Sequence, residues 1–345
     1  MKIGLVGCGR IASDHVMVYR QIGNVKIAAV SDIEIMKAKH FATKFRVDKA
    51  YSNPADIFDL KDLDFIDVCT PPSTHASIVK EAAKSGHNIL LEKPMALNTE
   101  ECDEMINAVH KNRVNLCVCH NQIFFPAIQQ AKKMIDSGHY DLLSFRTSIK
   151  ENPLLHSIPA WNTSAEERGI VWEVGCHPAY LHLHLLGDIT EVYAIGNKVR
   201  YPVYDEFSVL LKTADKAYGI IEVSWLAKET EKVYEIDDAD GKRAFMIAPP
   251  PYAAEGYELL TEKSGVAEGN LVSQLKKTLR YFIQRKAPLG YYIGHFYLIS
   301  SFMKSLTDNL PPPVQPEEGK KAIKLLECIE QSLDSHMAVQ VRYTS

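Results

Sequence analysis

A glycine-rich turn near the start of the chain constrains the fold more than any other feature. Residues 7–12, with the sequence GCGRIA, come directly after an apolar strand-like segment and open a stretch expected to be helical. In a GxGxxG/A fingerprint, the first glycine permits a tight turn and the second lets a pyrophosphate approach the backbone. The small third residue keeps the helix close to the sheet, and free N–H groups at the helix N-terminus bind the anion. The residues expected to bind a dinucleotide here are Gly7, Gly9, Arg10 and Ile11.

The first third of the chain alternates apolar strand-like segments with helical ones. The strand-like segments are residues 2–6, 25–31, 65–70, 88–91 and 116–119, and the helical segments include 33–45, 77–85 and 99–111. Strands separated by helices of this length pair in parallel through right-handed crossovers. Nearly all the strand residues are apolar, as expected when helices cover both faces of a sheet. We therefore predict an α/β Rossmann dinucleotide-binding domain at residues 1–122.

The rest of the chain, residues 123–345, is predicted to form an α+β catalytic domain. Its strand-like segments are residues 142–149, 191–199, 206–211, 217–225, 232–236, 244–247 and 257–261. The short turn-like joints between most of them indicate a large, mostly antiparallel open sheet. Helices are expected at residues 128–137, 171–186, 271–284, 294–308 and 316–335, and an irregular loop at residues 152–168.

The composition narrows the class of protein. A chain of 345 residues suits two domains, and its formal net charge of −4 offers no basic surface to nucleic acid or anionic lipid. No apolar segment reaches the roughly 20 residues that span a bilayer, and no signal peptide precedes the first strand. The seven cysteines form no CxxC pair, which favours reduced thiols in a cytoplasmic protein. We expect neither nucleic acid nor a membrane as a partner.

Asp32 strengthens the cofactor assignment. It ends the second strand-like segment, where an acidic side chain hydrogen-bonds the adenosine ribose of a dinucleotide. Because a carboxylate there repels a 2′-phosphate, we predict NAD in preference to NADP. The alternative is that Asp32 caps the helix expected at residues 33–45, and one side chain can do both.

A second candidate loop, residues 70–75 with the sequence TPPSTH, follows the third strand-like segment. Ligands of open α/β sheets bind at the carboxyl ends of the strands, so we predict that Thr70 and Pro71 contact the cofactor. The alternative is a proline-rich turn in which Ser73 or Thr74 caps the next helix.

The motif Glu92-Lys93-Pro94 stands at the end of the fourth strand-like segment. Together with the glycine turn, Asp32 and the TPPSTH loop, it resembles the glucose–fructose oxidoreductase / inositol dehydrogenase (Gfo/Idh/MocA) family over essentially the whole chain. Looser matches are GCHP at residues 175–178 with LLG at 185–187, and QPEEG at 315–319 with EQS at 330–332.

The resemblance implies roles for particular residues. Lys93 would be the active-site lysine beside the nicotinamide, joined to Pro94 by a cis bond. His177 would be the acid/base on the substrate side, with Glu173 as its carboxylate partner. Further residues implied at the cofactor are Glu92, which shapes the pocket, His75 near a phosphate or ribose, and Asn121 near the nicotinamide and substrate. A homodimer or homotetramer formed through the second sheet is implied as well.

Oxidising an alcohol needs hydride loss to the nicotinamide and proton loss from the hydroxyl, so a positioned base is required. Lys93 can serve if burial and the nicotinamide cation lower its pKa, whereas His177 needs less tuning. Glu173 and His177 are four residues apart, so on one helix they share a face with Tyr180 nearby. Pro178 could instead mark the first turn of that helix, which would leave Glu173 in the preceding loop.

Other interpretations of these residues stay open. His177 could be a structural histidine bonded to the backbone, and Lys93 a solvated surface lysine. Three further histidines, His156, His182 and His184, could join His177 at a metal, but no recognised ligand spacing is present and no metal is predicted.

Candidate substrate-binding residues are Trp161, Arg168 and Tyr180. Trp161 and Arg168 could line a sugar pocket, or they could pack their loop down. The chain also departs from the family pattern: an aspartate is common at the positions of Glu173 and Tyr180, and an arginine is frequent at that of Ile123. These departures leave the usual arrangement for binding polyols open.

The expected activity is NAD(H)-dependent hydride transfer between nicotinamide C4 and a secondary alcohol of a sugar, sugar derivative or cyclic polyol. Lys93 and His177 would handle the hydroxyl proton. One alternative is an enzyme that holds NAD tightly and uses it transiently in epimerisation, elimination or glycoside cleavage. Another is a non-catalytic NAD-binding regulator.

Overall fold

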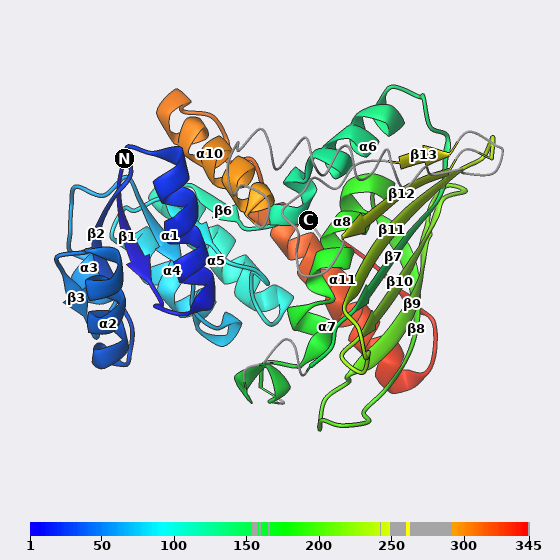
Figure 1. Cartoon of the computed structure of the whole chain (residues 1–345), viewed down its shortest axis with the longest axis horizontal. Helices are drawn as coiled ribbons and strands as arrows, with labels where there is room; N and C mark the ends of the chain where they lie inside the picture. Colours follow the sequence, from blue (N-terminus) through cyan, green and yellow to red (C-terminus); the bar gives the residue numbers. More distant parts are fainter. Residues whose placement is uncertain are drawn as a thin grey trace, which may run out of the picture.

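The computed structural model describes residues 1–153, 158, 160–164, 166–241, 243–248, 260–262 and 292–343. Two β-sheets stand side by side, each with helices packed against it (Figure 1). The predicted helix at residues 271–284 and the residue His156 lie outside the described residues, and so does most of the predicted strand at residues 257–261.

The first sheet has six strands in the order β3-β2-β1-β4-β5-β6, and every pairing is parallel. The strands are β1 (Lys2–Val6), β2 (Lys26–Ser31), β3 (Ala50–Tyr51), β4 (Phe65–Val68), β5 (Ile89–Leu91) and β6 (Leu116–Val118). This order is that of a doubly wound dinucleotide-binding sheet. Every residue of β4, β5 and β6 is buried, because helices cover both faces. The predicted Rossmann domain is confirmed.

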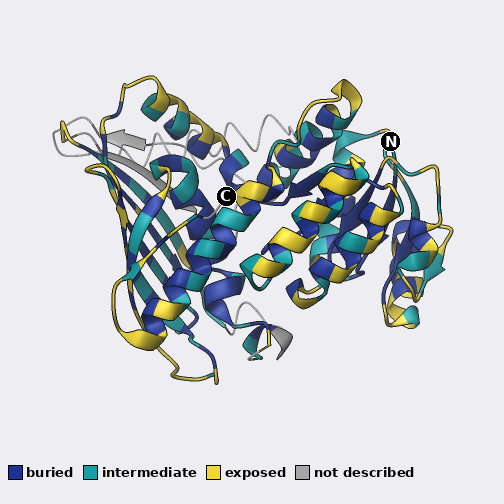
Figure 2. Cartoon of the chain, turned by 180° about the vertical axis from the view of Figure 1, so that it is seen from behind, coloured by how far each residue is buried: buried dark blue, intermediate teal, exposed yellow. Residues whose placement is uncertain are grey.

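Helices connect these strands in the predicted sequence. They are α1 (Arg10–Ile22), α2 (Ile35–Phe45), α3 (Ala55–Phe58), α4 (His75–Lys84) and α5 (Thr99–Asn112), with a 3₁₀ turn, η1 (Pro72–Thr74), before α4. Buried residues line the helix faces that turn toward the sheet (Figure 2). The short elements β3 and α3 were not predicted, since segments of two and four residues are too short to show a periodic pattern.

The second sheet has eight strands in the order β13-β12-β11-β7-β10-β9-β8-β14. Its strands are β7 (Leu142–Lys150), β8 (Ile189–Asn197), β9 (Glu206–Thr213), β10 (Tyr218–Ser224), β11 (Glu231–Asp238), β12 (Arg243–Ala248), β13 (Leu260–Glu262) and β14 (Val339–Gln340). Only the β7–β10 pairing is parallel. The predicted α+β domain with a mostly antiparallel sheet is therefore confirmed.

Two C-terminal helices connect the domains. Helix α10 (Ile293–Asp308) packs against α1 of the first domain, and α11 (Pro316–Ser335) contacts α5 and β6 on one side and β8 and α8 (Cys176–Leu186) on the other. A Cβ at Gly319 of α11 would lie only 2.7 Å from the sulfur of Met95, so the helix packs closely against the first domain at this position. The C-terminal helices thus hold the two sheets together.

The connection between the domains carries two short helical elements. They are η2 (Asn121–Phe124) and α6 (Pro126–Asp136). The predicted domain boundary after residue 122 falls inside η2, at the point where the chain leaves the first sheet.

The helix predicted at residues 171–186 is two helices. Helix α7 (Ile170–Glu173) ends before Gly175, and α8 begins at Cys176 with Pro178 in its first turn. A Cβ at Gly175 would lie 2.3 Å from the carbonyl oxygen of Val171, so the bend requires glycine. The argument that Glu173 and His177 share one helix face is wrong. Pro178 marks the first turn of the helix, as the alternative proposed, but Glu173 ends the short helix α7 and does not lie in a loop.

All seven cysteines are free and buried, in agreement with the expected reduced thiols. Among the residues that the structure describes, no helix combines the length and apolar character needed to cross a bilayer.

Candidate active site

The glycine turn has the geometry that the fingerprint predicts. Gly7 has a φ of 92°, and a Cβ there would lie 2.5 Å from the carbonyl oxygen of Cys69, so no other residue fits. A Cβ at Gly9, the N-cap of α1, would meet nothing within 4 Å, which leaves space beside the helix N-terminus. Arg10 is exposed and Ile11 half-buried in the first turn of α1. The turn therefore leaves room for a phosphate to approach the backbone.

Asp32 ties the end of β2 to this turn. Its carboxylate accepts hydrogen bonds from the backbone N–H groups of Cys8 at 2.9 Å and Glu34 at 3.0 Å. Helix α2 begins only at Ile35, so Asp32 orders the turn before the helix and is not its N-cap. The ammonium of Lys37 lies 3.3 Å from the Asp32 carboxylate.

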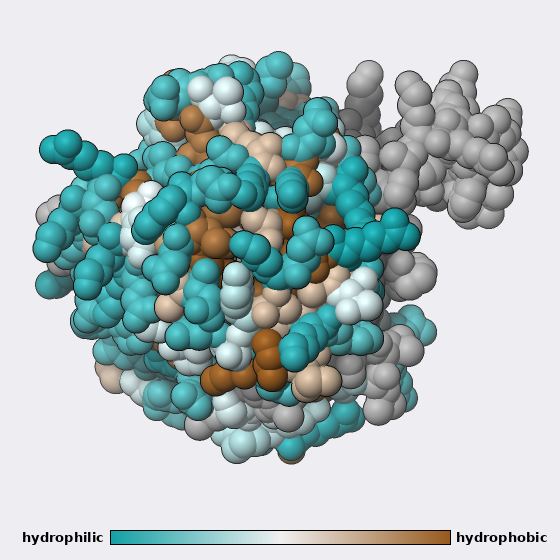
Figure 3. Space-filling model, turned by 90° about the vertical axis from the view of Figure 1, so that its left-hand side faces the viewer, coloured by the Kyte–Doolittle hydropathy of each residue, from teal (hydrophilic) through white to brown (hydrophobic). Residues whose placement is uncertain are grey.

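Two apolar side chains beside Asp32 were not predicted as site residues. Ile33 and Met36 are 90% and 71% exposed. The first-domain end of the molecule carries mostly hydrophilic side chains, with apolar ones in the gaps between them (Figure 3). An exposed isoleucine next to the carboxylate predicted to bind the ribose could have been recognised as a candidate surface for the flat face of a base.

The TPPSTH loop follows β4 as predicted, with Thr70 half-buried and Pro71 exposed at the carboxyl end of that strand. Ser73 and Thr74 make no side-chain cap to α4, so the capping alternative is wrong. Ser73 instead donates a 2.5 Å hydrogen bond to Glu167 of the second domain.

His75 is fully buried between two loops. Its Nδ1 lies 3.0 Å from the Pro94 carbonyl oxygen and its Nε2 lies 2.9 Å from that of Thr70. Both ring nitrogens are thus engaged by the backbone, and the ring joins the TPPSTH loop to the EKP loop. Its predicted place near a phosphate or ribose stays a prediction, in which the ring would support the loop without contacting the ligand through nitrogen.

Lys93 reaches from the first domain to the second. The Lys93–Pro94 bond is cis, as predicted. The ammonium donates to the Glu173 carbonyl oxygen at 3.0 Å and lies 3.3 Å from the Glu173 carboxylate, with only 13% of its side chain exposed. Burial is the largest single influence on the pKa of Lys93 and lowers it, but Glu173, Cys176 and Glu92 together outweigh burial and the pKa is raised. Lys93 is therefore no solvated surface lysine, and it keeps its proton at neutral pH.

His177 is half-buried in the first turn of α8, and its Nδ1 lies 2.7 Å from the hydroxyl of Tyr180. Burial lowers the pKa of His177 well below its usual range, and the positive charge of Lys93 lowers it further. The expectation that Glu173 orients His177 is wrong, because Glu173 pairs with Lys93. Tyr180, at a position where the family commonly has an aspartate, is the partner of His177.

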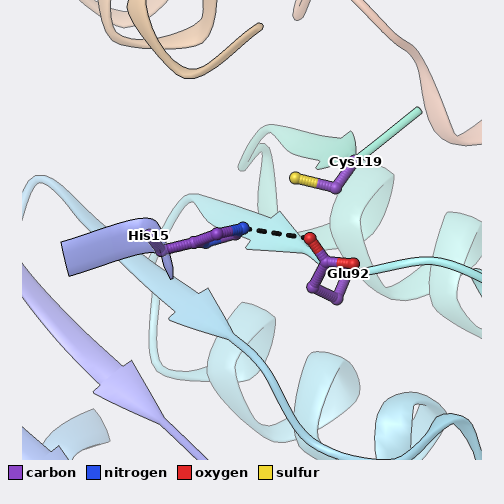
Figure 4. A group of neighbouring side chains, drawn as sticks. All are labelled: His15, Glu92 and Cys119. Atoms are coloured by element: carbon purple, nitrogen blue, oxygen red, sulfur yellow. Dashed lines mark hydrogen bonds and ion pairs between the residues drawn. The ribbon is translucent and has the colours of Figure 1, made fainter. Parts of the chain in front are cut away.

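Glu92 belongs to a buried charge cluster that was not predicted. His15 of α1 lies 2.9 Å from the Asp67 carboxylate and 3.0 Å from that of Glu92. Figure 4 shows the contact with Glu92 and the thiol of Cys119 nearby. Burial is the largest single influence on the pKa of His15 and lowers it, but Asp67, Cys69 and Cys119 together outweigh burial and the pKa is raised well above the usual value. A protonated His15 has no lone pair for a metal and balances charge on the carboxylates, so the cluster, with the thiol of Cys119 beside it, has the chemistry of an ion-pair network. Asp67, a carboxylate inside an apolar strand, could have revealed it.

A polar connection runs from this cluster to the second domain. The His295 Nε2 on α10 lies 3.6 Å from the Glu92 carboxylate, and its Nδ1 lies 3.3 Å from the amide nitrogen of Asn121. The Asn121 side-chain oxygen accepts a 3.3 Å hydrogen bond from the Tyr180 hydroxyl. The structure thus places Asn121 between the two predicted halves of the site. No sequence motif marks His295, which lies on α10, 174 residues after Asn121 in the chain.

The candidate substrate residues have different surroundings. Arg168 donates to the Leu97 carbonyl oxygen, pairs with Glu330, and stacks over the ring of Trp172 at 4.0 Å. These contacts favour the alternative in which Arg168 packs its loop down. Tyr180 is 3% exposed. The backbone of Trp161 lies in the 3₁₀ turn η3 (Ala160–Thr163).

Of the three histidines considered as metal ligands beside His177, the structure describes His182 and His184. His182 is buried, with its two nitrogens 2.7 Å and 3.1 Å from the carbonyl oxygens of Pro178 and Phe145. These bonds give His182 a structural role. Burial lowers the pKa of His184 to about 4.

Two family models match the chain. Residues 1–120 match an oxidoreductase family with an NAD-binding Rossmann fold, and residues 128–242 match the Gfo/Idh/MocA C-terminal domain, so together they cover about two thirds of the chain. The chain belongs to the Gfo/Idh/MocA family. This Gfo/Idh/MocA member is accordingly an oxidoreductase with an NAD-binding domain, which confirms the resemblance seen in the sequence.

Similar proteins include named dehydrogenases. The myo-inositol 2-dehydrogenase of Thermotoga maritima is 24% identical, over 99% of this chain and 98% of that protein. The D-apiose dehydrogenase of Paraburkholderia graminis is 25% identical, over 73% of this chain and 74% of that protein. A structure of levoglucosan dehydrogenase with NADH and levoglucosan has a TM-score of 0.82 at 21% identity and covers 99% of both chains. This last likeness shows the fold.

Proposed function

We propose that this Gfo/Idh/MocA member transfers a hydride between nicotinamide C4 of NAD(H) and a secondary alcohol carbon of a sugar, sugar derivative or cyclic polyol. The observation that carries the proposal is a contact between the two domains: the lysine of the EKP loop hydrogen-bonds Glu173, which precedes the helix that carries His177. The positive charge of Lys93, in the first domain, lowers the pKa of His177 in the second domain and so favours a neutral imidazole.

The two side chains have complementary tasks. When bound, NAD supplies the acceptor for the hydride. The Lys93 ammonium, held charged by Glu173, donates a hydrogen bond to the hydroxyl oxygen and stabilises the negative charge that develops there. The neutral His177 accepts the hydroxyl proton in oxidation and returns it in reduction.

The proposed preference for NAD over NADP rests on Asp32. Its carboxylate is nearly buried at the end of β2 and fixed by two backbone N–H groups, so it cannot turn away from a 2′-phosphate without losing them. Lys37 acts in the opposite sense, because its ammonium beside the carboxylate attracts a phosphate. The carboxylate is the closer group to the glycine turn, and we propose that it dominates.

The proposed substrate class follows the named relatives, which act on inositol and apiose by their names. Two positions distinguish this chain from the family pattern. Ile123, where an arginine is frequent, is 7% exposed and faces the core, and Tyr180 is bonded to Asn121 and Gln122. Neither side chain offers a charge to the substrate, so we propose an uncharged sugar or polyol.

We further propose a cytoplasmic homodimer or homotetramer formed through the second sheet. Tyr193 of β8 and Leu210 of β9 lie opposite one another and are both exposed, with Ile195 exposed on the same strand as Tyr193. Apolar side chains gathered on one sheet face favour contact with another copy. Light scattering of Leu210→Glu against the wild type tests this: the variant should be smaller in mass.

The experiment that tests the function has two steps. Purified protein is first denatured and its released cofactor measured, and the native protein is then screened with NAD⁺ against sugars and polyols for NADH formation. The proposal expects exchangeable NAD and NADH formation with at least one neutral polyol. Firmly retained NAD with turnover that needs no added cofactor would favour transient use of NAD. Binding of NAD with no turnover in the whole library would contradict the proposal and favour a regulator.

A further inference from the structure

A series of five polar side chains begins at His177 and ends in the buried charge cluster. In order they are His177, Tyr180, Asn121, His295 and Glu92. The successive separations are 2.7 Å, 3.3 Å, 3.3 Å and 3.6 Å. We call this set the polar series. It crosses both domains, and its members come from α8, η2, α10 and the EKP loop.

We propose that Asn121 and His295 are positioning residues that fix the tautomer of His177, with the proton on Nδ1 and a free lone pair on Nε2. The inference deepens the proposed function, on which it rests for its catalytic meaning. It follows from asking, at each link of the polar series, which group must donate and which must accept.

The charge of Glu92 determines which atoms of the polar series donate and which accept hydrogen bonds. Burial raises the pKa of Glu92, but its contacts with His15 and His295 together outweigh burial and the pKa lies well below the usual value, so the carboxylate is ionised and can only accept. Because His295 Nε2 faces this carboxylate, that nitrogen carries the proton. The amide nitrogen of Asn121 lies 3.3 Å from His295 Nδ1 and can only donate, so Nδ1 is the acceptor and holds no proton.

The remaining links follow from Asn121. With its nitrogen committed to His295, its oxygen faces Tyr180 and accepts the single hydroxyl proton. The Tyr180 oxygen can then only accept, and it does so from the backbone N–H of Gln122 at 3.2 Å. His177 Nδ1, 2.7 Å from the same oxygen, must therefore carry a proton. Since His177 is neutral, its Nε2 is the free base.

The aromatic ring of Tyr180 is itself held in place. It stacks on the ring of His120 with centroids 4.2 Å apart and an interplanar angle of 14°. Burial lowers the pKa of His120 to about 3, so this stacking partner stays neutral. A rotated tyrosine hydroxyl could donate to His177 and reverse its tautomer, and the two hydrogen bonds from Tyr180 and Gln122 together with the stacking oppose that rotation.

The opposite arrangement would have a different consequence. If His295 carried protons on both nitrogens, Asn121 would turn its oxygen toward His295 and its nitrogen toward Tyr180. Tyr180 would then donate to His177, whose Nε2 would hold the proton and act as an acid. The charge state at one end of the polar series thus decides the chemistry at the other.

The direct test is long-range ¹H–¹⁵N NMR of the full-length protein with ¹⁵N-labelled histidine rings, with the His177 signals assigned by their loss in His177→Gln. The proposal expects the Nδ1–H form in the wild type. In His295→Leu the polar series is broken, and a mixture of both tautomers should appear. His295→Gln should restore the Nδ1–H form, because a side-chain amide can donate to Glu92 and accept from Asn121. His110→Leu, at an exposed histidine, is the control and should leave His177 unchanged.

Kinetics supply a second measurement. In the oxidation direction, kcat/KM should fall about tenfold in His295→Leu, the equivalent of one lost hydrogen bond, and recover in His295→Gln. An Nε2–H form in the wild type, or a His177 spectrum unchanged in His295→Leu, would overturn the inference. The NMR result needs no substrate, so it stands or falls separately from the proposed reaction.

Discussion

The two domains contribute to the site in different ways. The first domain presents loops that directly follow parallel strands, and each of its candidate residues lies within a few positions of a strand end. The second domain contributes side chains from the start of a helix after a bend, and α10 returns from near the C-terminus to add His295. A parallel sheet therefore fixes its binding groups by local sequence, whereas the catalytic side depends on contacts between distant segments.

The largest expected effect comes from the residue where the two domains meet. Lys93→Met should lower turnover by about 10³-fold, because the charge that stabilises the alkoxide is lost. Calorimetry should show NAD binding close to that of the wild type, since the glycine turn and Asp32 are untouched. Turnover that survives the substitution would remove Lys93 from the mechanism and leave the second domain to act alone.

Glu173→Gln keeps Lys93 in place but removes the carboxylate that favours its charged form. The Glu173 carboxylate raises the pKa of Lys93, so its loss should lower that pKa and move the alkaline decline of activity to lower pH. The raised pKa also stabilises the fold below the unfolded-state value of about 10.4, and this contribution disappears as pH rises through the folded-state value. The pH profile of kcat checks the first effect. An alkaline limb that does not move would show that Lys93 is not the titrating group.

Asp32→Ala examines the cofactor side by itself. The ratio of kcat/KM for NAD to that for NADP should fall by about tenfold, or ~1.4 kcal/mol, because a repulsive carboxylate is removed. Lys37→Ala is the matched control and should raise the same ratio, since the neighbouring positive charge is lost. A ratio unchanged in both variants would mean that another residue selects the cofactor.

The smallest effect is expected where the loop of the second domain is tied down. Arg168→Met should lower the free energy of unfolding by about 1 kcal/mol, through loss of the pair with Glu330 and the stacking on Trp172. Lys304→Met removes an exposed ion pair and should have almost no effect. Denaturant titration compares the two. Equal stability of both variants would show that the Arg168 contacts contribute nothing, and would return this residue to the substrate candidates.

The sequence predicted those features of the site that depend on residues close together in the chain. The glycine turn and Asp32 were predictable because each is fixed by neighbours in sequence and by its place at a strand end, whereas the cis bond after Lys93 was implied by the family resemblance. Both sheets were likewise predicted from alternating and continuous apolar segments.

The pairing of side chains across domains was not predictable. Helical periodicity predicted that Glu173 lies beside His177. The chain instead bends at Gly175, where the Val171 carbonyl oxygen leaves no room for a Cβ, and Glu173 pairs with Lys93. His15 and His295 carry no motif, and only tertiary packing brings them to opposite sides of Glu92. Such contacts depend on where α1 and α10 cross, which a single sequence does not encode in any local pattern.

The most direct test of hydride transfer between the two domains is isotopic. A polyol substrate found in the screen, deuterated at its carbinol carbon, is incubated with NAD⁺ and the protein, and the NADH formed is examined by NMR. The account predicts deuterium at C4 of the nicotinamide, on one face only, and none in solvent. Deuterium released to water, or NADH without label, would contradict hydride transfer at this site.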